Sequence, residues 1–214
     1  MSGAVVIGAG PGIGTAVARR FAKEGLPVTV IARSRSTVDS AIEALGPVEA
    51  LGVLADSTDA EALRSALDQA IEEYGTPEVV VYNAAIIQAD SPGELAVQDH
   101  LDAWAVNVVG AITAAGHVLP AMAARGSGSF LVTGGMPEPV PAYTSLSLGK
   151  AGLRALVELL HTQYGESGIH VAEVRVDGPV APGTAFDPED IAEHYWQLHV
   201  QEPANWSRQF AHTG

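Results

Sequence analysis

Two side chains that could take part in proton transfer lie close together in the segment PAYTSLSLGKAG, which runs from Pro141 to Gly152. The Tyr143 hydroxyl can donate or accept a proton, and the Lys150 ammonium can tune such a group. On a helix, seven residues correspond to a rise of ~10.5 Å, so the two side chains share a face but are two turns apart. The residue one turn before Lys150 is Leu146, which cannot transfer a proton. Pro141 indicates that the helix begins near here, so Tyr143 acts beside Lys150 only if the loop before the helix folds it over the site.

A second candidate site lies in VVIGAGPGIGTAVARRFAKEG, where a β-branched run leads into a glycine-dense turn and then a helical pattern. Gly8, Gly12 and Gly14 shape this turn, with Ile13 between the last two. A turn this tight needs residues without a Cβ, so that backbone N–H groups can approach a phosphate. The N-terminus of the following helix adds its positive dipole end. The segment therefore predicts a site for the pyrophosphate of a dinucleotide.

Composition limits the partners of the chain. Its 214 residues are 47% hydrophobic and 17% charged, which predicts one globular domain over residues 1–214. The net charge of −14 argues against a nucleic-acid partner and against an anionic membrane surface. There is no cysteine, and the seven histidines form no metal-ligand pattern, so no metal site is expected. We find neither a targeting segment nor an apolar run approaching roughly 20 residues, and therefore expect a cytoplasmic protein.

The order of hydrophobic patterns predicts the architecture. The predicted strands are residues 4–7, 27–32, 48–54, 78–82, 129–133 and 170–176. The predicted helices are residues 12–24, 36–45, 59–74, 95–125, 145–166 and 188–200. Continuous hydrophobicity suits strands buried on both faces, and strand–helix alternation implies right-handed parallel crossovers. We therefore predict an α/β fold, a single doubly wound Rossmann-type domain whose parallel sheet has helices on both faces.

Five motifs, in this order, resemble those of the short-chain dehydrogenase/reductase family over nearly the whole chain to about Thr184. They are GAGPGIG (8–14), LADST (54–58), YNAAI (82–86), VNVVG (106–110) and DGPVAPGT (177–184). The resemblance implies a nicotinamide-dependent oxidoreductase that acts on a small carbonyl or alcohol substrate. The cofactor-binding residues that it implies in these motifs are Gly8, Gly12, Ile13, Gly14, Asp56, Asn83, Ala84, Gly178, Pro179 and Val180.

The end of the second predicted strand, VTVIARSRS, bears on the choice of cofactor. An acid at this strand end would bind a ribose 2′-hydroxyl, whereas a cation favours a 2′-phosphate. By the family pattern the acid would fall at Ala32, and Arg33 follows it; a guanidinium can bind phosphate bidentately. Ser34 and Arg35 offer further donors. We therefore expect NADP rather than NAD, although Pro11 lies where some NADP-preferring members of the family carry a basic residue.

In the family, the active site combines a Tyr, a Lys four residues later, a Ser and an Asn. The resemblance places the lysine, which also holds the ribose, at Lys150 and the asparagine at Asn107. The tyrosine position is Leu146, and the strand GSFLVTGG ends in Gly134 and Gly135 where the family has two serines. The chain thus resembles an atypical member that keeps Lys and Asn, and Tyr143 is the candidate for a substitute proton donor.

Two functions stay open on this pattern. An oxidoreductase could use Tyr143 or water as its proton source once hydride transfer is arranged. A module that binds NADP(H) in a sensing or structural role would need neither the tyrosine nor the serine. Ser147 and Lys150 also match the S-x-x-K pattern of some acyl-transfer enzymes, but the companion motifs of that class are absent.

The resemblance also bears on assembly. Segments 95–125 and 145–166 are similar to the helices that pair in dimers and tetramers of the family, which implies a homodimer or homotetramer. Small residues such as Ala111, Ala114, Ala115 and Gly116 would let such helices approach closely. The segment 177–214, rich in Pro and Gly at its start, would cover the substrate or build a subunit interface.

Overall fold

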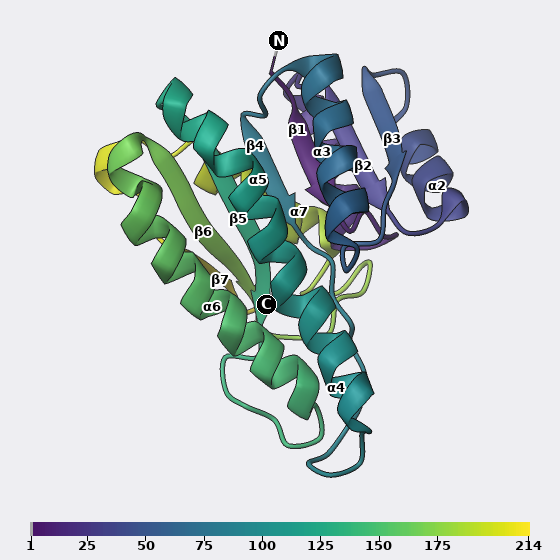
Figure 1. The fold of residues 1–214 in the computed structure, drawn as a ribbon. Coiled ribbons are helices and arrows are strands. Elements are labelled where there is room, and N and C mark those ends of the chain that lie inside the picture. Colours follow the sequence, from purple (N-terminus) through teal and green to yellow (C-terminus); the bar gives the residue numbers. More distant parts are fainter. Residues whose placement is uncertain (1) are drawn as a thin grey trace.

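The computed structural model of the chain, which describes residues 2–214, contains a parallel sheet (Figure 1). Its seven strands are β1 (Ala4–Ile7), β2 (Val28–Ala32), β3 (Ala50–Leu54), β4 (Val79–Tyr82), β5 (Gly128–Gly135), β6 (Ile169–Val176) and β7 (Gln209–His212). They lie side by side in the order β3-β2-β1-β4-β5-β6-β7.

Helices cover both faces of this sheet. One face carries α1 (Ile13–Lys23), α2 (Arg35–Leu45) and α7 (Pro188–His199). The other carries α3 (Ala60–Tyr74), α5 (Gly110–Arg125) and α6 (Thr144–Tyr164). α4 (Val97–Trp104) leads into α5 through a π-helical turn, Ala105–Val109, and projects beyond the sheet (Figure 1). The predicted fold, a single doubly wound α/β domain, is confirmed.

The strands are buried because each face of the sheet packs on apolar helix residues. All residues of β1, β2 and β4 are buried. Successive side chains of a strand point to opposite faces, so Val5 enters the layer beneath α3 and α5 while Val6 enters the layer beneath α1 and α7. Burial of one such side chain contributes roughly 1.5–3 kcal/mol. This explains why continuous rather than alternating hydrophobic runs predicted these strands.

Polar caps determine where several helices begin. Ser34 caps α2 by accepting a hydrogen bond from the Thr37 N–H, and Asp59 and Asp187 cap α3 and α7 in the same way. α1 follows a different rule, since its N-cap is Gly12 and no side chain caps it. The first turn of α1 therefore has no side chain that competes with a ligand for its N–H groups.

The order of the strands reverses between β1 and β4, which lie side by side. From β1 the sheet grows through β2 and β3 in one direction, and from β4 it grows in the other. Open α/β sheets bind ligands beyond the carboxyl ends of their strands at such a switch point. Gly8 and Asn83, the residues that directly follow β1 and β4, therefore mark the place to look for a site.

Three elements differ from the sequence expectations. β5 continues through Gly135, so both glycines at its end belong to the strand. Residues 209–212 of the tail form β7, where Gln209 pairs with Glu173, because the edge of β6 would otherwise leave backbone groups unpaired. Segment 95–125, predicted as one α-helix, is interrupted by the π-helical turn.

One helical segment, Val97–Arg125, is long and apolar enough by composition to cross a membrane. The sequence expectation that no apolar segment is long enough to cross a membrane was therefore wrong. In this fold 56% of its most apolar stretch is buried, and Ala111, Ala114 and Ala115 belong to the core between the helices and the sheet. Packing within the domain therefore accounts for about half of the apolar character of this segment, while Val97, Leu101, Trp104 and Ile112 stay exposed.

Candidate functional site

Glycines in the turn between β1 and α1 serve two different purposes. Gly8 has a φ of +87°, and a Cβ there would overlap the backbone of Ala84. A Cβ at Gly14 would overlap the carbonyl oxygen of Gly8. Close packing of the turn thus requires these two glycines. In contrast, a Cβ at Gly10 or Gly12 would meet no atom within 4 Å.

The open side of this turn fits a phosphate group. α1 begins at Ile13 without a side-chain cap, and its Thr15 N–H donates to the Gly10 carbonyl oxygen within the turn. Uncapped N–H groups and the positive end of a helix dipole favour an anion. The space beside Gly10 and Gly12 lets such an anion approach the backbone. The residues present therefore fit the pyrophosphate of a dinucleotide.

A continuous line of hydrogen bonds joins the glycine turn to α6. The Asn83 amide group donates to the Gly8 carbonyl oxygen at 2.8 Å, and its oxygen accepts from the Thr133 hydroxyl at 2.7 Å. Lys150 Nζ donates to the Thr133 carbonyl oxygen at 2.6 Å. The structure thus brings together three of the predicted site residues, Gly8, Asn83 and Lys150. Both ends of the Asn83 amide are engaged, so its side chain positions the turn.

The Thr133 hydroxyl is also held by Tyr195, a residue of α7. Their hydroxyl oxygens lie 2.6 Å apart, and because Thr133 donates to Asn83, Tyr195 donates to Thr133. Tyr195 is fully buried, and burial raises the pKa of its phenol. Both hydroxyls are therefore engaged in hydrogen bonds that hold Asn83 and Thr133 in place.

Lys150 is a buried charge. Only 6% of the residue is exposed, and burial lowers the pKa of its ammonium from 10.5 to about 8. The carboxylate of Glu173 acts in the opposite direction and favours the charged form. At neutral pH the ammonium is therefore mostly charged, although it loses its proton far more readily than an exposed lysine. Such a group can bind hydroxyl oxygens and stabilise negative charge nearby.

The first turn of α6 places Leu146 one helical turn before Lys150, and the Leu146 side chain is buried. The serines on either side of it are engaged elsewhere. The Ser145 N–H and hydroxyl both donate to the buried Asp90 carboxylate. The Ser147 hydroxyl accepts a hydrogen bond at 3.0 Å from the backbone N–H of Val140, in the loop before the helix. The first turn therefore offers Lys150 no hydroxyl at the spacing of one turn.

Tyr143 is the N-cap residue of α6, and its backbone forms an isolated bridge with Asp90. The side chain is half-buried. Within residues 2–214, the Tyr143 hydroxyl makes no hydrogen bond, and none joins it to Lys150. The structure thus places Tyr143 at the start of the helix that carries Lys150, with its hydroxyl unengaged.

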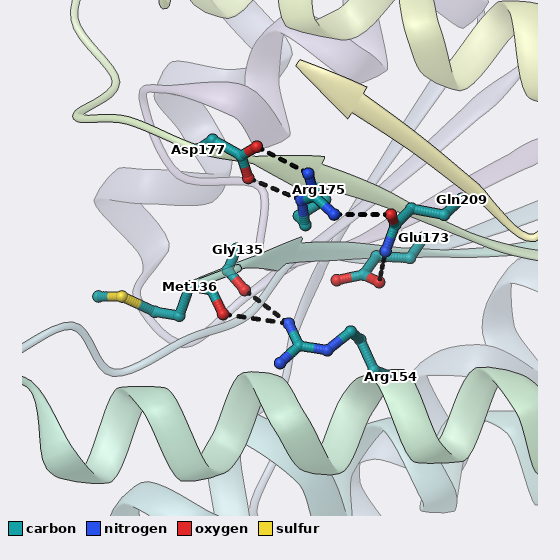
Figure 2. A network of polar contacts seen from close by, with 7 residues as sticks. All are labelled: Gly135, Met136, Arg154, Glu173, Arg175, Asp177 and Gln209. Atoms are coloured by element: carbon teal, nitrogen blue, oxygen red, sulfur yellow. Dashed lines mark hydrogen bonds and ion pairs between the residues drawn. The ribbon is translucent and has the colours of Figure 1, made fainter. Parts of the chain in front are cut away.

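Two glycines end β5 where the family resemblance expects serines. A Cβ at Gly134 would overlap the Glu173 carboxylate. Arg154 of α6 donates to the carbonyl oxygens of Gly135 and Met136 at 3.1 and 3.2 Å (Figure 2). Met136 has a φ of +48°, which is uncommon for a residue with a side chain, so the guanidinium holds a strained turn in place. This strand end is therefore fixed by charged neighbours.

Asn107 lies in the π-helical turn and is fully buried. Its amide oxygen accepts from the Ile86 N–H at 2.8 Å, and its nitrogen donates to the Ile86 carbonyl oxygen at 3.3 Å. A Cβ on Gly149 would lie 2.7 Å from the Cβ of Asn107, so the two helices touch here. Asn107 thus joins the segment after β4 to the helix of Lys150.

The end of β2 carries the side chains expected to distinguish the cofactors. Arg33 is exposed and, within the described part of the chain, makes no ion pair. The Ser34 hydroxyl caps α2 and lies 2.7 Å from the Thr37 hydroxyl. Arg35 differs, because its guanidinium lies 4.0 Å from the Asp39 carboxylate. An exposed cation beside hydroxyls at a helix N-terminus fits a phosphate group.

Two further predicted segments lie at the carboxyl ends of the strands. Asp56 follows β3, and one of its carboxylate oxygens accepts from the Thr58 N–H and hydroxyl at 2.9 and 2.8 Å. After β6, Gly178 lies against Phe186, whose ring a Cβ at position 178 would overlap. Residues 179–180 are exposed. These segments lie at the same edge as the glycine turn, but no hydrogen bond joins them to Lys150 within residues 2–214.

Sequence reasoning missed three residues of this site. The sequence did contain a signal for Glu173, because a carboxylate in the middle of the apolar run IHVAEVRV is unusual. Arg154 lies one turn after Lys150 on α6, which only the helix geometry makes meaningful. Tyr195 reaches Thr133 from the far end of the chain, and no sequence pattern pointed to it.

Known proteins are similar to this chain in sequence and in fold. The family model for short chain dehydrogenase matches residues 2–185. Glucose 1-dehydrogenase 2 of Bacillus subtilis (strain 168) is 31% identical over 195 residues, which cover 88% of this chain and 73% of that protein. Cis-4-hydroxycyclohexanecarboxylate dehydrogenase of Sinomonas cyclohexanicum is 33% identical over 190 residues, with 86% and 74% covered. The crystal structure of an actinorhodin polyketide ketoreductase variant with NADPH is similar with a TM-score of 0.91 at 26% identity, covering 98% of this chain and 94% of that chain.

Proposed function

The chain belongs to the short-chain dehydrogenase family, and within it we propose an NADP(H)-dependent oxidoreductase that acts on a small carbonyl or alcohol with a non-standard proton donor. The observation that carries this proposal is the hydrogen-bonded line from Gly8 through Asn83 and Thr133 to Lys150. It connects the glycine turn, whose open side fits a phosphate, to a buried ammonium at the same edge of the sheet. Both are what a bound dinucleotide needs.

Different residues of the chain would bind different parts of the cofactor. The glycine turn would bind the pyrophosphate, Asp56 the adenine and Lys150 the nicotinamide ribose, while residues 178–180 would cover the nicotinamide. The bound nicotinamide supplies or accepts the hydride. Lys150 would present its ammonium to the ribose hydroxyls, and the burial that holds its side chain in place also limits the access of water.

The preference for NADP rests on the end of β2. Ala32 provides no carboxylate there to repel a phosphate, and Arg33 is exposed beside the hydroxyl of Ser34. The structurally similar ketoreductase variant holds NADPH. A 2′-phosphate on this surface would gain a charge-assisted hydrogen bond that a 2′-hydroxyl cannot match.

The proton donor is the non-standard part of the site. Leu146, Gly134 and Gly135 supply no hydroxyl where the family resemblance expects them. Tyr143 is the proposed substitute, because its hydroxyl is unengaged at the start of the helix that carries Lys150. The serines of the first turn are committed to other partners, which leaves Tyr143 or a water molecule as the source.

A second candidate function is a binding module that holds NADP(H) without hydride transfer. The buried Leu146 favours it, because a buried leucine one turn before Lys150 cannot relay a proton. In this alternative the line from Gly8 to Lys150 would serve retention of the dinucleotide alone.

One experiment separates the two. NADPH and NADH are titrated into the protein by fluorescence, and NADPH consumption is then followed with a panel of aldehydes and ketones. The oxidoreductase binds NADPH more tightly than NADH and consumes it with at least one carbonyl. Tight binding without consumption on any substrate would support the binding module, and no binding of either nucleotide would refute both functions.

The variant Tyr143→Phe tests the proposed donor, because it removes the hydroxyl and keeps the ring. We expect turnover to fall by roughly 10²-fold, the scale of general acid–base catalysis, with NADPH affinity unchanged. Thr144→Val is the matched control, since it removes a neighbouring exposed hydroxyl that bonds only the loop backbone. Equal turnover in Tyr143→Phe and the parent would remove Tyr143 from the mechanism.

We further propose a homodimer or homotetramer formed through α4, α5 and α6. These helices expose several large apolar side chains, and apolar side chains gathered on a protein surface mark interaction sites. The exposed residues are Val97, Leu101, Trp104, Ile112, Leu148 and Leu159. Light scattering of Ile112→Glu should report a smaller particle than the parent, and an unchanged mass would contradict this assembly.

A further inference from the structure

A buried carboxylate of β6, the strand paired with the one that accepts the Lys150 hydrogen bond, has no role in the function proposed above. Glu173 lies in the middle of β6 and is 2% exposed. One of its oxygens accepts a hydrogen bond from the Gln209 side chain at 2.9 Å (Figure 2). The other oxygen, Oε1, is buried and has no hydrogen-bond partner within residues 2–214. An unpartnered buried carboxylate oxygen is costly, so its retention calls for an explanation.

The Glu173 carboxylate fills the space beside Gly134 that a side chain at position 134 would otherwise occupy. A Cβ built on Gly134 would overlap the Oε1, Cδ and Cγ atoms of Glu173. Position 134 is one of the two positions where the resemblance expects a serine. The glycine is therefore needed for Glu173 to reach the end of β5, and the two residues form a matched pair.

Charged groups face Glu173 from two elements. α6 contributes Lys150 and Arg154, and the adjacent position on the same face of β6 contributes Arg175. The Arg175 guanidinium is engaged with the Asp177 carboxylate at 2.8 and 2.9 Å (Figure 2). Arg154 donates to the turn after β5. Lys150 is the one of these three cations that is itself deeply buried, and thus the one that most needs a counter-charge.

The effects on both groups agree with such a pairing. Burial raises the pKa of the Glu173 carboxyl, and Arg154, Lys150 and Arg175 oppose that rise. Burial lowers the pKa of Lys150, and Glu173 opposes that fall. Gln209 of β7 donates to Glu173 and also stabilises its charged form, so the late edge strand takes part.

We propose that Glu173 is a positioning residue of this site, whose carboxylate takes the room left by the glycine at position 134 and keeps the buried Lys150 ammonium charged. Its consequence for catalysis rests on the proposed function, since the charged ammonium would hold the ribose. The pairing itself is a property of the folded chain and can be measured without cofactor or substrate.

The sequence allows a direct test, because the chain has only two lysines, Lys23 and Lys150. Protein labelled with ¹³C at lysine Cε therefore gives two NMR signals, which Lys150→Met assigns. The pH titration of the Lys150 signal is measured in the parent and in Glu173→Gln, which keeps the size of the side chain and removes its charge. Glu158→Gln, the loss of an exposed carboxylate that pairs with Arg208, is the control.

We expect Glu173→Gln to lower the Lys150 titration midpoint by on the order of one pH unit, because loss of the carboxylate removes an attraction that favours the charged ammonium. Glu158→Gln should leave it in place. An unchanged midpoint in folded Glu173→Gln would overturn the proposal, because it would show that the Glu173 charge does not affect the protonation of Lys150.

A second measurement tests the matched pair. Gly134→Ser should lower the melting temperature, since the new side chain overlaps Glu173, and Glu173→Ala in the same chain should restore part of the loss. Strictly additive effects of the two substitutions would contradict the pairing.

The two proposals can fail separately. A shifted Lys150 midpoint in a protein that binds no nicotinamide would retain the pairing and refute the cofactor. Tight NADPH binding with an unchanged midpoint would do the reverse.

Discussion

The buried ammonium of Lys150 makes the stability of the protein depend on pH in a defined window. Its pKa is lowered from 10.5 to about 8 in the folded chain because the side chain is buried. Between these two values the unfolded chain binds more protons at this position than the folded chain, so the free energy of unfolding rises with pH. At about 1.4 kcal/mol for each pH unit, this lysine contributes a rise of about 3 kcal/mol.

The perturbation that isolates this effect is Lys150→Met, which keeps the length of the side chain and removes its charge. Urea unfolding of the parent and the variant is measured at intervals from pH 7.5 to 10.5. Other groups titrate in both proteins, so the difference between the two curves reports position 150 alone. We expect the parent to gain about 3 kcal/mol relative to the variant across this range.

Lys23→Met is the matched control, because it removes the other lysine, which is exposed on α1. A parent and a Lys150→Met variant whose free energies of unfolding stay a constant distance apart would refute the reasoning. That result would mean that Lys150 is solvated in the folded protein and that its burial does not disfavour the charge.

Three further predictions follow from the geometry of the site. Gly14→Ala should lower the free energy of unfolding by roughly 1–3 kcal/mol in urea unfolding, because its Cβ overlaps the turn, whereas Gly10→Ala should keep the parent stability and weaken NADPH binding in a fluorescence titration. Tyr195→Phe should cost about 1 kcal/mol of stability for the lost hydrogen bond to Thr133, with NADPH affinity unchanged; a large loss of affinity would give Tyr195 a direct role. Arg33→Ala should weaken NADPH binding by roughly tenfold and leave NADH binding nearly unchanged, and an equal effect on both nucleotides would contradict a 2′-phosphate contact.

Much of the fold could be predicted from the sequence because its signals are local. Continuous β-branched runs marked strands buried on both faces, and their alternation with helical spacing implied the parallel sheet. The glycine turn was predictable for the same reason, since Gly8 and Gly14 are needed by the geometry of the turn itself. β7 was missed because the segment QFAH is short, and only the open edge of β6 makes it a strand.

The site was harder to predict, because its interactions join segments that are distant in the chain. Lys150 and Asn83 were expected to bind the cofactor, but their connection through both the hydroxyl and the carbonyl oxygen of Thr133 depends on strand register. Asn107 was expected in the active site, and its engagement with Ile86 could not be foreseen from a helix motif. The close approach of the Glu173 carboxylate to Gly134 likewise depends on the register of two neighbouring strands.

Transfer of deuterium from the cofactor tests the proposed oxidoreductase most directly. The protein is incubated with NADPH deuterated at the reactive carbon of the nicotinamide, in both stereochemical forms, and with the carbonyl panel; products are analysed by mass spectrometry. We expect that one form passes deuterium to the carbonyl carbon of at least one product, and that Lys150→Met abolishes this transfer. Saturating NADPH binding with no deuterium in any product would contradict it and would leave a dinucleotide-binding module.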